Sequence, residues 1–493
     1  MVVRPLARAT LIALLVSLAP RPAAAGPVTV QHLEPGGWIF GSCCVDLDGD
    51  GRMEILLQIA AEGHRALALF RQTEAGFGST PDQVLPVPED AAYHVAGPVG
   101  PEDARGVLFL EPGWARFHAW RDGGLVPEGR RLFELPLFPH RPHPEFCYAW
   151  RIAGDLDGDG RNDLVLPFVE PAGPSGYRVF SRARAEHYAP IASLPVALRE
   201  EYTARPGAIA CYRSALALPT LADLDGDGRL DVMFLVGPRV LAYRQRESGG
   251  FHPRPMVDAP LAFLRDVPEG EVALDRLLVA DLDGDGVADA LYLRKVGRLG
   301  LFQSLRTRIE VFLGPFHDKV RPDQILNLPG LTRRPRLFDF DGDGDLDLLE
   351  GTLEVNAFSV LRRIAGDTVP AVFRLRACDR ESRRFEPEPR ITLARNLPFE
   401  ELIDYSPVPL VFLHGDFDGD GRNDLLEAVS ATRIEARAGG TAPDGRAEFA
   451  DRPLFSVELA YSSDNLFLTD LTGDGRTDVL AHVGTRASVV LCR

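Results

Sequence analysis

The sequence lacks the patterns that build helices or cross a membrane. Amphipathic helical periodicity is nearly absent, and only one short helix is expected, near Val196–Tyr202. Beyond residue 25 no run of 18 or more apolar residues occurs, so no membrane span is predicted. Basic residues are outnumbered, because 54 lysines and arginines stand against 71 acids and the net charge is −17. We therefore expect no nucleic-acid partner.

Familiar catalytic motifs are also missing. The sequence contains no G-x-S-x-G elbow, no H-E-x-x-H helix, no phosphate-binding glycine loop and no cysteine–histidine signature. Catalytic acids and bases on scattered loops would leave no such motif. An enzyme is therefore kept as the less favoured alternative to a binding protein.

Cysteine is scarce, with six residues: Cys43, Cys44, Cys147, Cys211, Cys378 and Cys492. Six cysteines allow fifteen pairings, and spacing alone does not choose among them. Cys147 and Cys211 each lie shortly before one of the acidic loops described below, so we predict a disulfide between these two. Buried free thiols are the alternative for every cysteine of the chain.

The segment 1–25 is predicted to be a signal peptide. Arg4 and Arg8 precede the apolar run Thr10–Ala19, and Ala23–Ala25 offers a small-residue cleavage site. No cysteine follows that site, which argues against a lipoprotein. We therefore expect residues 26–493 to be exported, either to the periplasm or to the cell surface and medium.

Aspartate, in contrast, recurs in a strict pattern. The motif D-x-D-G-D-G-x-x-D, or a near variant, occurs seven times, and we number the copies loops one to seven. They start at Asp46, Asp155, Asp223, Asp281, Asp339, Asp416 and Asp470. Acidic side chains at positions 1, 3, 5 and 9 gather hard oxygen donors, and glycines at positions 4 and 6 let the backbone turn tightly around one ion. An EF-hand is disfavoured because it needs flanking helices.

The loops predict up to seven Ca²⁺ sites, each with side-chain ligands at positions 1, 3, 5 and 9 and a backbone carbonyl at position 7. In loop order the expected ligands are Asp46, Asp48, Asp50, Arg52, Glu54, Asp155, Asp157, Asp159, Arg161, Asp163, Asp223, Asp225, Asp227, Arg229, Asp231, Asp281, Asp283, Asp285, Val287, Asp289, Asp339, Asp341, Asp343, Asp345, Asp347, Asp416, Asp418, Asp420, Arg422, Asp424, Asp470, Thr472, Asp474, Arg476 and Asp478. Without residues 1–25 the net charge is −20, and seven Ca²⁺ ions would bring it to −6. Much of the acidity is therefore expected to serve as metal ligand.

Three substitutions distinguish the loops. Glu54 replaces aspartate at position 9 of loop one and can still chelate, whereas Thr472 replaces the second aspartate of loop seven, which should bind most weakly. Asp345 stands at position 7 of loop five, where the backbone carbonyl is the ligand. Its side chain is therefore expected to face water.

The spacing of the loops predicts eight repeats. Successive loops start 109, 68, 58, 58, 77 and 54 residues apart, and the first interval is nearly twice the common one. A unit without a metal loop fits there, with its turn at Pro98–Arg105 and strands Gly106–Glu111 and Ala115–Trp120. Each repeat holds four short apolar strands, one of them directly after the loop, as in Leu164–Phe168.

Four antiparallel strands repeated about every 61 residues are typical of a β-propeller blade, so we predict an all-β, eight-bladed propeller with seven blades as the alternative. The last repeat stops after its third strand, Ser488–Cys492, and an orphan strand, Val28–His32, lies near the N-terminus. We expect this strand to complete the last blade and close the ring, covering an edge that would otherwise be open to aggregation.

Strings such as GDLDGDGRNDLVL at 154–166 and ADLDGDGRLDVMF at 222–234 resemble the FG-GAP or VCBS repeats, which are related to the propeller of integrin α subunits. The resemblance covers residues 26–493, which we expect to be one domain and a monomer. Integrin-type Phe-Gly and Gly-Ala-Pro signatures are largely absent, so the likeness is closer to bacterial VCBS-type propellers. It implies an exported, calcium-stabilised, non-enzymatic protein with an unknown protein or glycan ligand; the alternative is a carbohydrate-active enzyme similar to polysaccharide lyases on calcium-bearing propellers.

Overall fold

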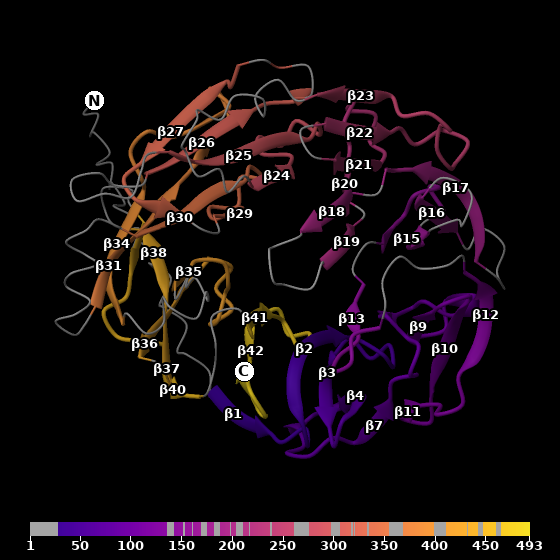
Figure 1. The fold of residues 1–493 in the computed structure, drawn as a ribbon. Coiled ribbons are helices and arrows are strands. Elements are labelled where there is room, and N and C mark those ends of the chain that lie inside the picture. Colours follow the sequence, from indigo (N-terminus) through magenta and orange to yellow (C-terminus); the bar gives the residue numbers. More distant parts are fainter. Residues whose placement is uncertain are drawn as a thin grey trace, which may run out of the picture.

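The chain folds into a ring of β-sheets that are arranged as the blades of a propeller (Figure 1). This computed structural model describes residues 28–493 except for 136–141, 151–152, 160, 169–174, 182–187, 198, 204–210, 216, 237–238, 261–275, 297–305, 317–318, 320, 333–334, 354–367, 399–410, 431, 442–446 and 460–464. The described residues form eight four-stranded blades and no α-helix, so the eight-bladed all-β prediction is confirmed. In the same residues no helix is long and apolar enough to cross a membrane.

Seven blades use four strands in chain order, and the eighth takes its outer strand from near the N-terminus. Blades 1 to 4 consist of β2 (Trp38–Val45), β3 (Glu54–Ala61), β4 (His64–Phe70) and β7 (Gln83–Pro86); β8 (Tyr93–Gly97), β9 (Gly106–Glu111), β10 (Trp114–Arg121) and β12 (Arg130–Glu134); β14 (Ala153–Gly154), β15 (Asp163–Phe168), β16 (Gly176–Ser181) and β17 (Ala189–Pro195); β20 (Pro219–Ala222), β21 (Asp231–Val236), β22 (Arg239–Tyr243) and β23 (Val257–Pro260). Blades 5 to 8 consist of β24 (Arg276–Ala280), β25 (Asp289–Val296), β26 (Arg306–Phe312) and β27 (Gln324–Leu328); β29 (Arg336–Phe338), β30 (Asp347–Leu353), β31 (Thr368–Arg376) and β34 (Ile391–Pro398); β35 (Val411–Phe412), β36 (Leu425–Ser430), β37 (Arg433–Arg437) and β40 (Phe455–Glu458); β41 (Leu466–Thr469), β42 (Asp478–Val483), β43 (Arg486–Cys492) and β1 (Val28–Leu33).

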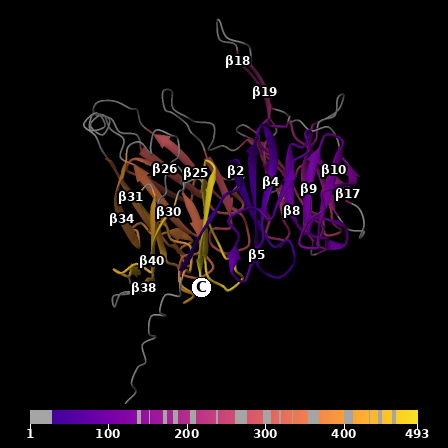
Figure 2. The same ribbon diagram turned by 90° about the horizontal axis from the view of Figure 1, so that it is seen from below.

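Shorter elements lie in the connections between these strands. They are β5 (Gln72–Thr73), β6 (Gly76–Phe77), the 3₁₀ turn η1 (Pro101–Asp103), β11 (Gly124–Leu125), β13 (Tyr148–Ala149), β18 (Arg199–Thr203), β19 (Cys211–Ala215), β28 (Leu331–Thr332), β32 (Cys378–Asp379), β33 (Arg384–Phe385), β38 (Gly439–Thr441) and β39 (Ala447–Phe449). The hairpin β18–β19 stands out beyond the blades on one side of the ring, whereas β5 and β38 lie toward the other side (Figure 2).

The second strand of a blade is the most enclosed, because neighbouring blades cover both faces of each sheet. Every residue of β15 is buried, and so is every residue of β9. These strands therefore need apolar side chains on both faces, which is why their sequences read as continuous apolar runs rather than alternating ones. The prediction that this strand directly follows the loop is confirmed: β3, β15, β21, β25, β30 and β42 begin at position 9 of their loops.

Blade 2 is the predicted unit without an acidic loop. Its strands β8, β9 and β10 flank the turn at Pro98–Arg105 where the spacing placed it, and the turn contains η1. Arg105 from this turn donates to the backbone oxygen of Asp46 in loop one, and Asp103 lies 3.5 Å from the Nε atom of Arg161 in loop two. The turn therefore links the loops on either side of it.

The ring closes as predicted. All six residues of β1 pair antiparallel with β43, from Val28 opposite Cys492 to Leu33 opposite Ala487. The sheet order of blade 8 is thus β1-β43-β42-β41, with the N-terminal strand outermost.

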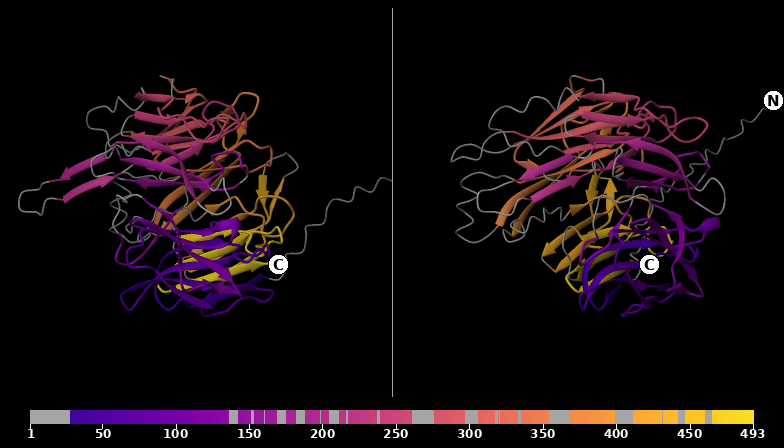
Figure 3. Two further views of the ribbon diagram at one scale, coloured as in Figure 1. Left: turned by 90° about the vertical axis from the view of Figure 1, so that its right-hand side faces the viewer. Right: turned by 45° about the vertical axis from the view of Figure 1, so that its right-hand side comes forward.

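Two expectations are wrong. The helix expected near Val196–Tyr202 does not form in the described residues, because Arg199–Thr203 is the strand β18, which pairs with β19 in an inserted hairpin. The Cys147–Cys211 disulfide is also absent, since Cys147 is a free, buried thiol. Cys147 precedes β13, which pairs with β8 inside the ring, while Cys211 belongs to the hairpin that projects beyond it (Figure 3). Cys378 and Cys492 are buried free thiols too.

Candidate metal centres

The acidic loops all join the first and second strands of their blades, so the seven lie on one side of the ring. In loops one to five, three loop carboxylates each bring one oxygen within 4.8 Å of the others. These groups are Asp46, Asp48 and Asp50; Asp155, Asp157 and Asp163; Asp223, Asp225 and Asp227; Asp281, Asp283 and Asp285; Asp339, Asp341 and Asp347. Residues predicted from the motif as joint ligands are therefore brought together by the fold.

The position-1 carboxylate organises the turn. In loop three the Asp223 oxygens accept hydrogen bonds from the N–H groups of Gly226 at 2.8 Å and Gly228 at 2.6 Å. Both glycines have positive φ angles, 77° and 81°, which other residues adopt only with strain. The loop backbone is thereby wrapped around the carboxylate oxygens, as the motif predicts.

The position-9 carboxylate is built into the blade rather than into the loop surface. In loop three Asp231 is fully buried, and its two oxygens accept N–H bonds from Leu224 in the loop at 3.3 Å and from Gln245 beyond the third strand at 2.9 Å. Glu54, despite its longer side chain, accepts the equivalent bond from Leu47 at 2.7 Å. A carboxylate oxygen keeps a second lone pair in such an arrangement, so it still has a position for a cation.

Burial makes the negative charge at position 9 costly. Burial raises the pKa of this carboxyl to about 7 in Glu54, Asp163, Asp289 and Asp424, and to about 6 in Asp231, Asp347 and Asp478. Hydrogen bonds from the loop backbone oppose the rise, and the other loop carboxylates add to it. A divalent cation among these oxygens would remove both penalties.

Hydrogen bonds also run from loop to loop around the ring. The N–H at position 8 of one loop donates to a carbonyl at position 1 or 2 of the loop before it. These bonds join Ala288 to Asp223 (2.7 Å), Leu346 to Leu282 (2.9 Å), Thr477 to Asp416 (2.6 Å) and, across the closure of the ring, Met53 to Leu471 (2.9 Å). Each of these bonds therefore holds the end of one loop against the start of the loop before it.

Arginines from elsewhere in the chain contact the outer oxygens of three loops. Arg244 lies 2.7 Å from Asp225 and 2.9 Å from Asp227 in loop three. Arg383 pairs with Asp283 and Asp285 in loop four, and Arg390 pairs with Asp341 in loop five. The motif does not reveal these partners; the only signal in the sequence is the recurrence of arginine on and after the third strand.

One sequence expectation about the loops is wrong. The Asp345 side chain does not face water: its exposed fraction is 0%. Position 7 of loop five is pressed against loop four, because the next residue, Leu346, is hydrogen-bonded to Leu282. The backbone-carbonyl role expected of position 7 in all loops stays a prediction.

The donor set fits Ca²⁺. It consists of hard carboxylate oxygens, and two of them, Asp225 Oδ1 and Asp281 Oδ1, are buried without a hydrogen-bond partner. Buried, unpartnered anionic oxygens are costly unless a cation or donor meets them. These loops would hold the ion mainly by charge and by preformed backbone geometry.

Comparison with known families identifies one part of the chain directly. Residues 223–292, from loop three through loop four and into β25, match the FG-GAP-like repeat. The chain carries an FG-GAP-like repeat. In the structure this segment runs from the loop after β20 through the rest of blade 4 and into β25 of blade 5, and its two loops are the ones joined by the Ala288–Asp223 hydrogen bond.

The solved structures that match this chain share little sequence with it. An Agrocybe aegerita lectin that recognises non-reducing terminal N-acetylglucosamine is 13% identical, with 93% of this chain and 85% of that one covered and a TM-score of 0.31. A Lactobacillus plantarum protein is 12% identical (72% and 84% covered, TM-score 0.32), and the rhamnogalacturonan lyase YesX is 10% identical (93% and 90% covered, TM-score 0.27). At these TM-scores the likeness carries no argument about ligand or reaction. No curated protein matches the sequence.

The raised pKa values predict how calcium and pH act together. Without metal, a position-9 carboxyl such as Asp163 has a pKa of about 7 when folded and about 4 when unfolded, so the folded state holds the proton more tightly. Its contribution to stability is complete below pH 4 and is lost as pH rises through 7. Calcium requires the ionised form, so we expect the gain in Tm from calcium to grow from pH 5.5 to pH 8.

Melting curves in EDTA and in calcium across that pH range would measure this effect. A gain in Tm that is the same at every pH would contradict it, because it would mean that the buried carboxylates release no protons when calcium binds.

Proposed function

We propose that the chain is an exported calcium-binding β-propeller that serves as a non-enzymatic scaffold for binding a protein or glycan, with calcium in a mainly structural role. The observation that carries the proposal is the placement of the loop ligands. The position-9 carboxylates accept hydrogen bonds from the backbone just beyond the third strands of their blades, and the loops are hydrogen-bonded to one another around the ring. A metal so enclosed supports the scaffold, whereas a catalytic metal keeps an open coordination position for substrate.

Recognition is proposed on the side of the ring opposite the acidic loops. Connections between second and third strands, and between the fourth strand and the next blade, emerge there. The longest of these connections in the sequence are 351–368, 397–407 and 198–208, of which 354–367, 399–407, 198 and 204–208 lie outside the described residues. The third contains β18, which pairs with β19 just beyond it, and this hairpin projects from that side as an extended arm (Figures 2 and 3). Long loops on a rigid scaffold are where binding residues concentrate.

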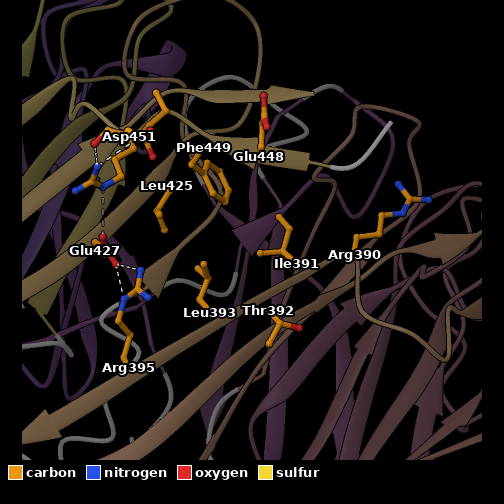
Figure 4. Close-up of a pocket in the computed structure, with 12 residues that line it drawn as sticks. Arg390, Ile391, Thr392, Leu393, Arg395, Leu425, Glu427, Glu448, Phe449 and Asp451 are labelled. Carbon is orange, nitrogen blue, oxygen red and sulfur yellow. Dashed lines mark hydrogen bonds and ion pairs between the residues drawn. The ribbon is translucent and has the colours of Figure 1, made fainter. Parts of the chain in front are cut away.

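The alternative, a lyase-like enzyme acting on an acidic polysaccharide, finds its best support in a cleft between blades 6 and 7 (Figure 4). This cleft has a volume of about 500 Å³ and contains Arg390, Arg395, Arg437 and Phe449. Arg395 lies 2.7 Å from the carboxylate of Glu427, and Arg437 lies 3.5 Å from it. Arg437 also lies 2.9 Å from Glu435, so both arginines already have carboxylate partners, which favours a structural role over recognition of an acidic sugar.

Replacing Arg199–Ala215 with a short Gly/Ser turn tests the recognition surface. Once a glycan array or pull-down has supplied a ligand, we expect this variant to bind it at least about tenfold more weakly, since a projecting arm would hold the central contacts. The Tm in calcium should be unchanged, because the hairpin pairs only with itself among the described strands.

Unchanged affinity in the folded variant would assign recognition to another surface. Cleavage of an acidic polysaccharide by the purified protein would favour the enzyme instead, and loss of that activity in Arg395→Ala would locate it in the cleft of Figure 4.

A further inference from the structure

In three pairs of successive acidic loops, the side chain at position 7 of one loop contacts the loop before it. A Cβ atom placed on the first loop glycine would lie 2.9 Å from the side chain at position 7 of the following loop in three cases: Gly226 with Val287, Gly284 with Asp345, and Gly419 with Arg476. The loop-to-loop hydrogen bonds at position 8 hold this contact in place. In these three pairs the side chain at position 7 therefore packs against the acidic loop of the preceding blade.

Asp345 is the one acid at this position. The others are arginine at 52, 161, 229, 422 and 476, and valine at 287. The Asp345 side chain is fully buried, and neither of its oxygens has a hydrogen-bond partner. An ionised carboxylate in that state is strongly unfavourable unless an opposite charge meets it.

Loop four also contains a buried carboxylate oxygen that lacks a hydrogen-bond partner. The Asp281 Oδ1 atom is likewise buried without a partner, while Arg383 contacts the Oδ2 atoms of Asp283 and Asp285. Asp281 and Asp283 repel the charge on Asp345, and no salt bridge to Asp345 is found among the described residues; Arg380 attracts it only at longer range. The Asp345 Oδ1 atom thus lies against Gly284, in a loop that carries a buried, unpartnered carboxylate oxygen of its own on Asp281.

We propose that Asp345 is an additional ligand of the cation bound by loop four, so that this site is assembled from blades 5 and 6. The inference rests on the calcium binding proposed above and goes beyond it by making one site unlike the rest. Loop four then offers five carboxylates, from Asp281, Asp283, Asp285, Asp289 and Asp345. Because affinity for Ca²⁺ rises with the number of charged ligands, this site binds most tightly and ties the two blades together.

The test uses two variants of the full-length mature protein. Asp345→Asn keeps the shape and removes the charge. Asp345→Val removes every ligand atom and copies the residue that loop four itself carries at position 7. Asp122→Asn, an exposed acid in the β10–β11 turn, is the matched control for the change in net charge. Calcium titration by calorimetry and melting curves with and without calcium are the readouts.

If Asp345 is a ligand, replacing it should raise the Tm measured without calcium and reduce the gain in Tm that calcium gives. Without calcium both variants melt higher than wild type, by roughly 2–4 °C, because an unpaired buried charge is gone. With calcium, the tightest class of sites weakens at least about tenfold and the gain in Tm shrinks, while the control behaves as wild type. A merely structural Asp345 would shift both melting curves in the same direction.

The outcomes separate this inference from the wider proposal. If the wild type binds calcium and both variants keep its tightest class of sites, Asp345 is not a ligand although the propeller is still a calcium protein. If the wild type binds no calcium, both ideas fail together.

Discussion

Removal of calcium is expected to lower the Tm of the protein by more than about 10 °C, and calcium should restore it. A ligand that binds only the folded state stabilises it by about 2.7 kcal/mol per site at a concentration one hundred times its Kd. Seven loops are present. Even if only part of this energy is realised, because loops three to five are partly neutralised by Arg244, Arg383 and Arg390, the sum exceeds the stability of many domains.

Thermal melting in EDTA, in calcium and in magnesium measures this effect. Magnesium should restore less, since it prefers a smaller octahedral shell and retains its waters. Asp163→Asn serves as an internal check, because it weakens one loop whose position-9 carboxylate is fully buried and should lower the Tm in calcium by less than EDTA does. An unchanged melting curve in EDTA, together with crystals grown in calcium that show no density between Asp155, Asp157 and Asp159, would refute the metal assignment.

The features that the sequence predicts well are those that repeat. A loop that must end on a buried carboxylate sets the start of the next strand, which is why strands such as β15 and β42 begin at Asp163 and Asp478. The metal-free blade was predictable for the same reason: the ring needs a sheet in every sector, so an interval of double length must hold one. The strand β1 was predictable because an unpaired third strand leaves an open edge.

The features that the sequence missed depend on contacts between blades. Asp345 is one residue from a main-chain bond to the preceding loop, and that bond turns its side chain into the neighbour's site instead of water. Arg383 reaches Asp283 across 100 positions in the chain. Cys147 and Cys211 occupy similar places relative to their loops, but one lies inside a blade and the other on an inserted hairpin. A repeat pattern describes one blade and carries no information on what a neighbour contributes.

Closure of the ring depends on β1, which binds to both of the blades that meet there. Leu33 is buried in the cluster shared by blades 8 and 1, whereas Val28 and Val30 pack on the cluster shared by blades 7 and 8. Gln31 adds two hydrogen bonds to the β5–β6 hairpin of blade 1, accepting one from Phe77 at 2.8 Å and donating one to Ala75 at 3.0 Å. Loss of β1 would therefore loosen two interfaces and not only one edge.

Deleting residues 26–34 from the chain 26–493 is expected to destabilise the protein by at least about 3 kcal/mol and to reduce its soluble yield. Burial of Leu33 alone contributes roughly 1.5–3 kcal/mol, and the exposed edge of β43 is apolar and unprotected, which favours pairing with other chains. The control is the chain 26–493, which keeps β1. Size-exclusion chromatography and melting curves in calcium would compare the two. A monomeric, equally stable variant would mean that the loop-to-loop bond from Met53 to Leu471 closes the ring by itself, and that β1 only decorates blade 8.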